Sequence, residues 1–181
     1  MASWAEFEIA SPRLAGIAGE RFATLEVLLV GTIRKDGGPR VTPIEYQVVD
    51  GNLYFGGMWQ SKKCLDMERD PRCVLHSPVT MKAGTEGDVK VSGFALTVTD
   101  PAERQHAAQV GFERSGSPRP KEPYHLFRLD IREVGFVVFG DGVAGFRTRL
   151  GASAGANVRL LGEGPNTSGY LVATWKAGTP R

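Results

Sequence analysis

Apolar and polar residues alternate along the first half of the chain, and short glycine turns interrupt the alternation. Asp36-Gly37-Gly38 and Asp50-Gly51 are hairpin turns by sequence, because glycine supplies the positive φ that such turns need. Between the two turns, residues 40–49 are rich in β-branched and aromatic side chains, as strands are. Gly56 and Gly57 let the backbone bend. This pattern predicts three antiparallel strands, with a fourth strand at residues 73–76.

Three helices are predicted from caps and helical spacing. Ser11-Pro12 starts the first helix, and apolar residues at helical spacing extend it over residues 12–23. Gln60 and Ser61 open a short basic helix that ends before Pro71, and Asp100-Pro101 starts a third that runs to about Phe112. Ahead of them, Trp4, Phe7 and Ile9 lie in a lead-in that is expected to pack onto the sheet.

The second half of the chain returns to strands. Residues 88–100 and 124–139 alternate with a period of two, and Gly93 is expected at a bulge. Residues 158–161 and 170–175 are predicted as short closing strands. A length of 181 residues suits one domain, 1–181, with residues 1–24 as its N-terminal helical lead-in.

Composition narrows the class of protein. A hydrophobic fraction of 41% and a charged fraction of 23% are ordinary for a globular domain, and a net charge of +2 is too small to indicate nucleic-acid binding. Two cysteines, Cys64 and Cys73, cannot build a metal site alone and are expected as reduced, buried thiols. The N-terminal region lacks a basic segment followed by an apolar run. A cytoplasmic location with no membrane contact is therefore expected.

The basic helix after Gln60 carries the clearest chemical pattern. A helix N-terminus presents unpaired N–H groups and the positive end of the helix dipole. Ser61, Lys62 and Lys63 lie at that end, and Arg40 is available from a preceding strand. Hydroxyl, ammonium and guanidinium groups together suit a phosphate. The alternative is a solvated helix face with no ligand.

This central stretch resembles the flavin-binding split barrels of the pyridoxamine 5'-phosphate oxidase-like superfamily. The resemblance rests on an ordered set of segments, namely Thr32-Ile33-Arg34, Pro39-Arg40-Val41-Thr42-Pro43, Asp50-Gly51-Asn52-Leu53-Tyr54-Phe55, Ser61-Lys62-Lys63, Leu65 and Arg69-Asp70-Pro71-Arg72. It implies a mainly β fold, a six-stranded antiparallel split β-barrel with two or three peripheral helices. It also implies a homodimer with cofactor sites at the subunit interface.

The resemblance carries site residues with it. Phosphate contacts are implied for Ser61, Lys62 and Lys63, with Gln60 beside them. The residues implied to lie along the cofactor are Arg40, Val41, Thr42, Tyr54, Phe55, Gly56 and Gly57. Trp175 is either an aromatic beside the flavin of the partner subunit or a plug at the end of the barrel. No side chain is required as a catalytic acid or base, and no metal is implied.

The implied function is an oxidoreductase that uses FMN or the deazaflavin cofactor F-420 to move hydride to or from a small organic substrate. FMN is favoured, because the basic cluster suits a single terminal phosphate. The arginine–histidine substrate motif of true pyridoxamine phosphate oxidases is absent near the C-terminus, so vitamin B6 oxidation is not expected. No Walker or H-E-x-x-H motif occurs.

The alternative function is a non-catalytic protein that binds or sequesters a flavin, a deazaflavin or haem. His76 and His125 are the candidate haem ligands in that case, and each is otherwise a packed strand residue. Residues 115–123 form a proline-rich basic loop that is either a lid or a plain connection.

Overall fold

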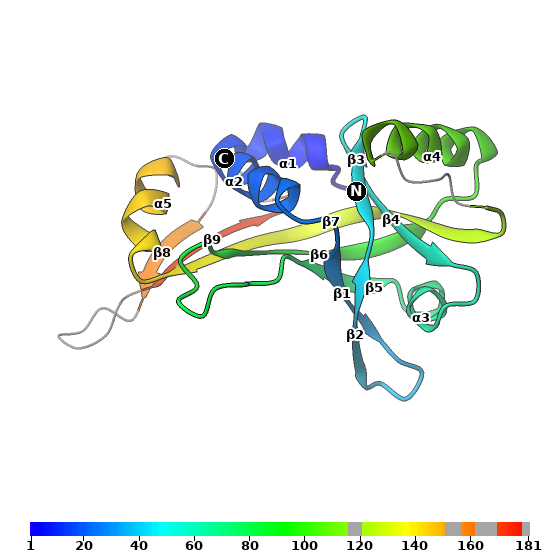
Figure 1. Cartoon of the computed structure of the whole chain (residues 1–181), viewed down its shortest axis with the longest axis horizontal. Helices are drawn as coiled ribbons and strands as arrows, with labels where there is room; N and C mark the ends of the chain where they lie inside the picture. The colour runs from blue at the N-terminus through cyan, green and yellow to red at the C-terminus, as the bar shows by residue number, and fades with distance from the viewer. Residues whose placement is uncertain (116–120, 151–156, 162–169, 179–181) are drawn as a thin grey trace.

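A mainly antiparallel β fold of the split-barrel type is present in the computed structural model, which describes residues 1–115, 121–150, 157–161 and 170–178 (Figure 1). Within these residues nine strands form one sheet: β1 (Leu28–Ile33), β2 (Pro39–Ile44), β3 (Tyr46–Val49), β4 (Asn52–Met58), β5 (Arg72–His76), β6 (Asp88–Thr97), β7 (Tyr124–Phe139), β8 (Asn157–Leu161) and β9 (Tyr170–Lys176). The predicted fold class is confirmed. The sheet has more strands than the predicted six and does not close on itself, because β2 and β3 remain at its two ends.

The long strand β7 organises this sheet. The strand order is β2-β1-β5-β6-β7-β4-β3, and β9 pairs with β7 and carries β8. The first residues of β7 pair with β4 and its last residues with β9, while β6 runs along its other edge. The register between β6 and β7 shifts at Ser92/Gly93, which confirms the predicted bulge at Gly93.

One predicted strand is two strands. Residues 40–49 divide at Glu45, and the halves lie at opposite ends of the sheet order. β2 pairs with β1 so that Ile44 faces Leu28, whereas β3 pairs with β4 so that Tyr46 faces Phe55. A bend of this kind is how strands turn the corner of a split barrel.

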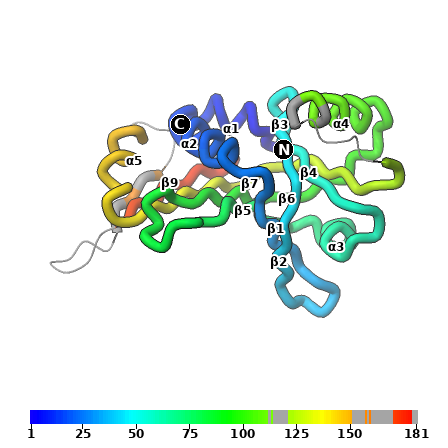
Figure 2. The backbone as a smooth tube through the Cα atoms, in the orientation of Figure 1, coloured from blue at the N-terminus to red at the C-terminus, as the bar shows by residue number. Residues whose placement is uncertain are grey.

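Five helices are present in the described residues, rather than two or three: α1 (Trp4–Ala10), α2 (Pro12–Ala23), α3 (Lys62–Arg69), α4 (Pro101–Ser115) and α5 (Gly142–Leu150). Figure 2 shows α1, α2 and α5 over one half of the sheet, and α4 over the other end. The three predicted helices are α2, α3 and α4. The lead-in is itself a helix, and α5 was not predicted.

The core lies between the sheet and helices α1 and α2. Trp4 and Phe7 of α1 are buried, so the lead-in packs as expected, although its Ile9 side chain is 67% exposed. The largest fully buried side chains include Phe7, Phe55, Phe127, Phe136, Leu14 and Ile131. Cys64 and Cys73 are buried free thiols, as expected.

The structure bears on two further expectations, the lid at residues 115–123 and the absence of membrane contact. Residues 116–120 of the proposed lid lie outside the described residues, so the lid stays a prediction. Within the described chain, none of the helices combines the length and apolar character that crossing a membrane demands.

Candidate functional site

Helix α3 is held against β1 and β2 by a buried carboxylate. Asp66, whose side chain is 7% exposed, accepts hydrogen bonds from Arg40 Nε at 2.6 Å and from Thr32 Oγ1 at 3.1 Å. Arg69 Nη1 donates to the other carboxylate oxygen at 3.3 Å. Burial raises the pKa of Asp66, but the hydrogen bonds from Arg40, Arg69 and Thr32 outweigh it and the pKa lies below its ordinary value. Asp66 is therefore charged at neutral pH and fixes the helix to the sheet.

Arg40, predicted to contact the phosphate, is partly engaged by this carboxylate. Its Nε atom donates to Asp66, and the two terminal nitrogens of its guanidinium group remain available for a ligand. Because Arg40 and Arg69 share one carboxylate, the three groups together carry one net positive charge. Arg40 thus contributes both to the fold and to the positive potential at the start of α3.

The N-terminus of α3 brings together several predicted residues. Ser61 is the N-cap, but its hydroxyl does not cap the helix. The Oγ atom is buried beside the sulfur of Cys64, a weak acceptor, and forms no hydrogen bond of ordinary geometry. Gly57 makes this arrangement possible, because a Cβ there would lie 3.3 Å from Ser61 Oγ and 3.2 Å from Lys63 Cε. Strand β4 and helix α3 meet at this glycine.

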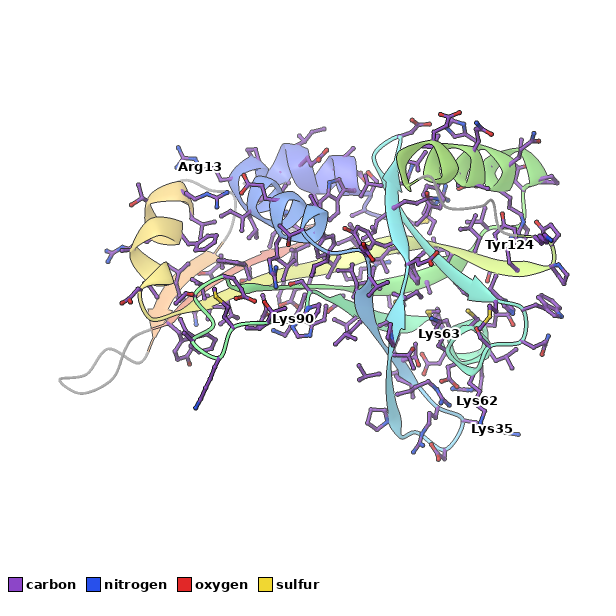
Figure 3. The ribbon with its side chains drawn as sticks, in the orientation of Figure 1. Arg13, Lys35, Lys62, Lys63, Lys90 and Tyr124 are labelled. Carbon is purple, nitrogen blue, oxygen red and sulfur yellow. The ribbon has the colours of Figure 1, made fainter. Side chains whose placement is uncertain are left out.

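Strand β2 completes the cluster. Lys63 Nζ donates to the carbonyl oxygen of Pro43 at 2.5 Å, which ties the start of α3 to β2. The neighbouring Thr42 has a buried Oγ1 atom with no hydrogen-bond partner in the part of the chain that the structure describes. Lys62 is exposed and forms no hydrogen bond or ion pair within the described chain. Figure 3 shows Lys62 and Lys63 beside α3, on the side of the molecule where Lys35 marks the β1–β2 hairpin.

Two predicted residues of β4 use their side chains for packing. Tyr54 donates its hydroxyl to Glu103 Oε1 of α4 at 2.8 Å, and burial raises the pKa of this tyrosine. Phe55 stacks on Phe127 in the core, with ring centroids 5.9 Å apart. At Gly56 a Cβ would lie 2.3 Å from the carbonyl oxygen of His125, so this glycine serves the close pairing of β4 with β7.

Two more predicted residues, Val41 and Trp175, lie outside the cluster. The Val41 side chain is exposed on β2, between Arg40 and Thr42. Trp175 is buried against Phe7, with ring centroids 5.1 Å apart. It pairs with Val134, whereas Gly57 pairs with His125, so the two positions are separated by roughly 30 Å along β7. A role for Trp175 in the site of a partner subunit stays a prediction.

The two histidines differ in their freedom to bind a ligand. His125, whose side chain is 2% exposed, has Nδ1 2.9 Å from Glu68 Oε1, and its Nε2 accepts the backbone N–H of Gln60 at 3.1 Å. Both of its ring nitrogens are therefore engaged. His76 is partly exposed on β5, and its Nε2 lies 3.6 Å from Asp88 Oδ1. Of the two haem candidates, only His76 has a ring nitrogen, Nε2, without a hydrogen-bond partner in the described part of the chain.

Comparison with protein families gives one match. The family model described as pyridoxamine 5'-phosphate oxidase matches residues 19–138, about two thirds of the chain. These residues include β1 to β6, β7 up to Val138 and the whole of the cluster at α3. No sequence match is found among curated proteins.

Solved structures share the fold. General stress protein 26 of Bacillus anthracis superposes with a TM-score of 0.54 at 21% identity, covering 68% of this chain and 93% of that one. A conserved hypothetical protein of Mycobacterium tuberculosis gives 0.54 at 23% identity, covering 74% and 82%. ChuZ of Campylobacter jejuni gives 0.59 at 11% identity, covering 69% and 55%. At these identities the likeness is one of fold.

Proposed function

The chain belongs to the pyridoxamine 5'-phosphate oxidase family, and on that premise we propose that it is a flavin-dependent oxidoreductase whose cofactor phosphate binds at the N-terminus of α3. This family commonly binds flavin or haem. The proposed cofactor is FMN, with the deazaflavin F-420 as the alternative, and the proposed substrate is a small organic molecule that gains or loses hydride.

The observation that carries this proposal is a pair of buried hydroxyls without partners. Thr42 Oγ1 on β2 and Ser61 Oγ at the start of α3 are both shielded from water, and neither makes a hydrogen bond of ordinary geometry with the described residues. Leaving a buried hydroxyl unpaired costs about 1–3 kcal/mol. A bound phosphate would offset that cost, since its oxygens accept hydrogen bonds from such groups.

The surrounding residues fit a phosphate. Lys62 and Lys63 supply positive charge, and the backbone N–H groups of these first two residues of α3 have no acceptor within the helix. The terminal nitrogens of Arg40 add donors from β2. When bound, the flavin would supply the hydride chemistry, and the protein would hold and orient it. One terminal phosphate matches the size of this cluster, which favours FMN.

The engagement of His125 argues against this histidine as a haem ligand. A haem ligand needs an imidazole nitrogen with a free lone pair. Both nitrogens of His125 are occupied within the protein, so using it would break the contact with Gln60 or with Glu68.

A homodimer is part of the proposal. Exposed apolar side chains adjoin the cluster in sequence, with Met58 80% and Trp59 53% exposed and with Val41 and Leu65 also at the surface. Apolar groups beside a binding site are typical of a surface that a partner covers. A second copy of the chain would bury them and complete the cofactor site. Sedimentation equilibrium of the purified protein should give twice the monomer mass of 19.6 kDa.

Titration with FMN and with deazaflavin tests the cofactor site directly. Wild-type protein should bind one of them with micromolar affinity, monitored by flavin absorbance and fluorescence. Lys62→Ala combined with Lys63→Ala should weaken binding by about tenfold or more, because two charge-assisted contacts are lost. Lys82→Ala with Lys121→Ala, two exposed lysines outside the cluster, is the matched control and should bind normally. Equal binding by both double variants would contradict the site assignment.

Turnover separates an oxidoreductase from a carrier. The protein loaded with cofactor is mixed without oxygen with reduced nicotinamide or reduced deazaflavin and a panel of quinones and enones. Consumption of the reduced donor together with an acceptor supports the enzyme. A bound cofactor that no donor and acceptor pair changes would instead support a non-catalytic binding protein.

A further inference from the structure

The turn that leads into α3 has an unusual backbone. Ser61 N–H donates to Met58 O at 3.1 Å, which closes a four-residue turn with Trp59 and Gln60 in its centre. Gln60 has φ of +59°, in the left-handed region. Turns with positive φ at the third position normally place glycine or asparagine there. A glutamine keeps this conformation only when its surroundings enforce it.

His125 supplies that enforcement from the neighbouring strand. Its Nε2 accepts the N–H of Gln60 at 3.1 Å, and a backbone N–H can only donate, so Nε2 carries the lone pair. The proton of the neutral ring is then on Nδ1, which donates to Glu68 Oε1 at 2.9 Å. Glu68 therefore fixes the tautomer in which Nε2 can accept. The contact joins β7, α3 and the turn between β4 and α3 (Figure 1).

Aromatic packing fixes the orientation of the ring. The Trp59 indole, from the same turn, stacks on the His125 imidazole with centroids 4.7 Å apart and planes 15° apart. Phe127 lies parallel to the imidazole, with centroids at 6.2 Å and planes at 1°. The imidazole cannot rotate out of this stack without displacing the turn. Gln60 of the turn is thus held by a hydrogen bond, and Trp59, the residue before it, by ring contact.

We propose that His125, with its tautomer fixed by Glu68, is a positioning residue that holds the 58–61 turn in the conformation that receives the cofactor phosphate. This inference rests on the proposed flavin site. The turn ends at Ser61, whose unpartnered hydroxyl and following N–H groups are the proposed donors. If Gln60 relaxed to negative φ, Ser61 and the first turn of α3 would shift relative to Thr42.

The test compares His125→Phe with wild-type protein. Phenylalanine keeps a ring in the stack and removes both hydrogen bonds, so FMN affinity should fall by about tenfold. In the ligand-free protein, hydrogen exchange of the Gln60 and Ser61 amides should become faster. Adding Gln60→Gly to His125→Phe should recover most of the lost affinity, because glycine adopts positive φ without support. A purely structural role for His125 would not predict rescue at Gln60.

Glu68→Ala provides a second route, because Glu68 is exposed and its loss does not threaten the core. It should lower FMN affinity by a few-fold, whereas Glu26→Ala, at an exposed glutamate between α2 and β1, should have no effect. If wild-type protein binds FMN and His125→Phe and Glu68→Ala bind it equally well, the positioning role is wrong and the proposed function stands. If wild-type protein binds no flavin, the proposed function is wrong and this inference fails with it.

Discussion

Helices α1 and α3 each begin after a serine, and these two serines, Ser3 and Ser61, behave differently. Ser3 caps α1: its Oγ accepts the N–H of Glu6 at 3.1 Å, and the Glu6 carboxylate accepts the N–H of Ser3 at 2.7 Å. Ser61 precedes α3 with extended backbone angles suited to the same role, yet its hydroxyl is buried and does not cap. The capping box at Ser3 satisfies N–H groups at the start of α1, a helix whose role is to pack on the sheet. The start of α3 is left with open donors.

The difference shows where the stability of α3 comes from. An uncapped helix of eight residues is not stable by itself. Asp66 in its middle compensates, since it anchors α3 to β1 and β2 through Thr32 and Arg40. Stability supplied at the centre leaves the N-terminus of α3 available for a ligand. The predictions below separate these two contributions.

Removing the anchor should have the largest effect. Asp66→Asn leaves Arg40 and Arg69 beside each other without a counter-charge, and should lower the free energy of unfolding by about 3 kcal/mol. Urea denaturation measures this loss. The matched change Asp36→Asn, in an exposed pair with Arg34, should cost less than about 1 kcal/mol. Similar values for the two variants would mean that Asp66 does not anchor the helix.

The contribution of Asp66 to the free energy of unfolding should also depend on pH, and it should decrease as the pH falls. Its pKa in the folded protein is lower than in the unfolded chain, so its stabilisation is complete above the unfolded value of about 4. As pH falls through the lower, folded pKa, the carboxylate is protonated and the stabilisation is lost. The stability difference between wild type and Asp66→Asn should therefore shrink from pH 5 towards pH 2. A difference that grew on acidification would contradict the assigned direction.

The fold could be predicted where local sequence decides the structure. Hairpin turns, caps and alternation gave α2, α3, β6 and β7, because those elements follow from their own residues. The break at Glu45 could not be predicted, since β2 and β3 separate only because β1 and β4 lie at different places in the sheet. Helix α5 contains two glycines and takes part of its stability from packing of Phe146 on Phe136. Helix α1 does carry a local signal, because Ser3 and Glu6 have the spacing of a capping box.

The lysines and the serine of the site could be predicted from the sequence, whereas the long-range contacts that hold the site together could not. Ser61, Lys62 and Lys63 are consecutive, so a helix start brings them together without further information. The pairing of Arg40 with Asp66 joins residues 26 positions apart, and it needs α3 to pack on β2. His125 lies 65 positions from Gln60, and only the pairing of β4 with β7 makes them neighbours. Long-range contacts of this kind carry no signal in a single sequence.

Replacing each of these two serines by alanine should have opposite consequences. The change at Ser3 should lower stability, whereas the change at Ser61 should lower flavin affinity. Ser3→Ala removes a working cap and should cost about 1 kcal/mol of stability, with flavin affinity unchanged. Ser61→Ala removes no cap and should change stability by less than about 0.5 kcal/mol, while flavin affinity falls about fivefold. Thermal unfolding without ligand and FMN titration measure the two quantities. Equal loss of stability in both variants would contradict the conclusion that Ser3 caps its helix and Ser61 does not.

The smallest effect on stability is expected at Thr42, and Thr32 on the adjacent strand is its control. Both lie in the β1–β2 pair, but Thr32 Oγ1 donates to Asp66 at 3.1 Å whereas Thr42 Oγ1 has no partner. Thr32→Val should therefore cost about 1 kcal/mol, the value of one hydrogen bond. Thr42→Val should leave the ligand-free protein unchanged or slightly more stable, because valine fills the same volume without an unpaired hydroxyl.

The same two variants should rank the other way round in flavin affinity, with the larger loss at Thr42. Thr42→Val should weaken FMN binding about threefold, because the proposed contact to the phosphate is lost. Thr32→Val should affect affinity only as far as it loosens α3. If Thr42→Val destabilised the free protein as much as Thr32→Val, its hydroxyl would have a partner within the protein. The main support for a phosphate at this site would then disappear.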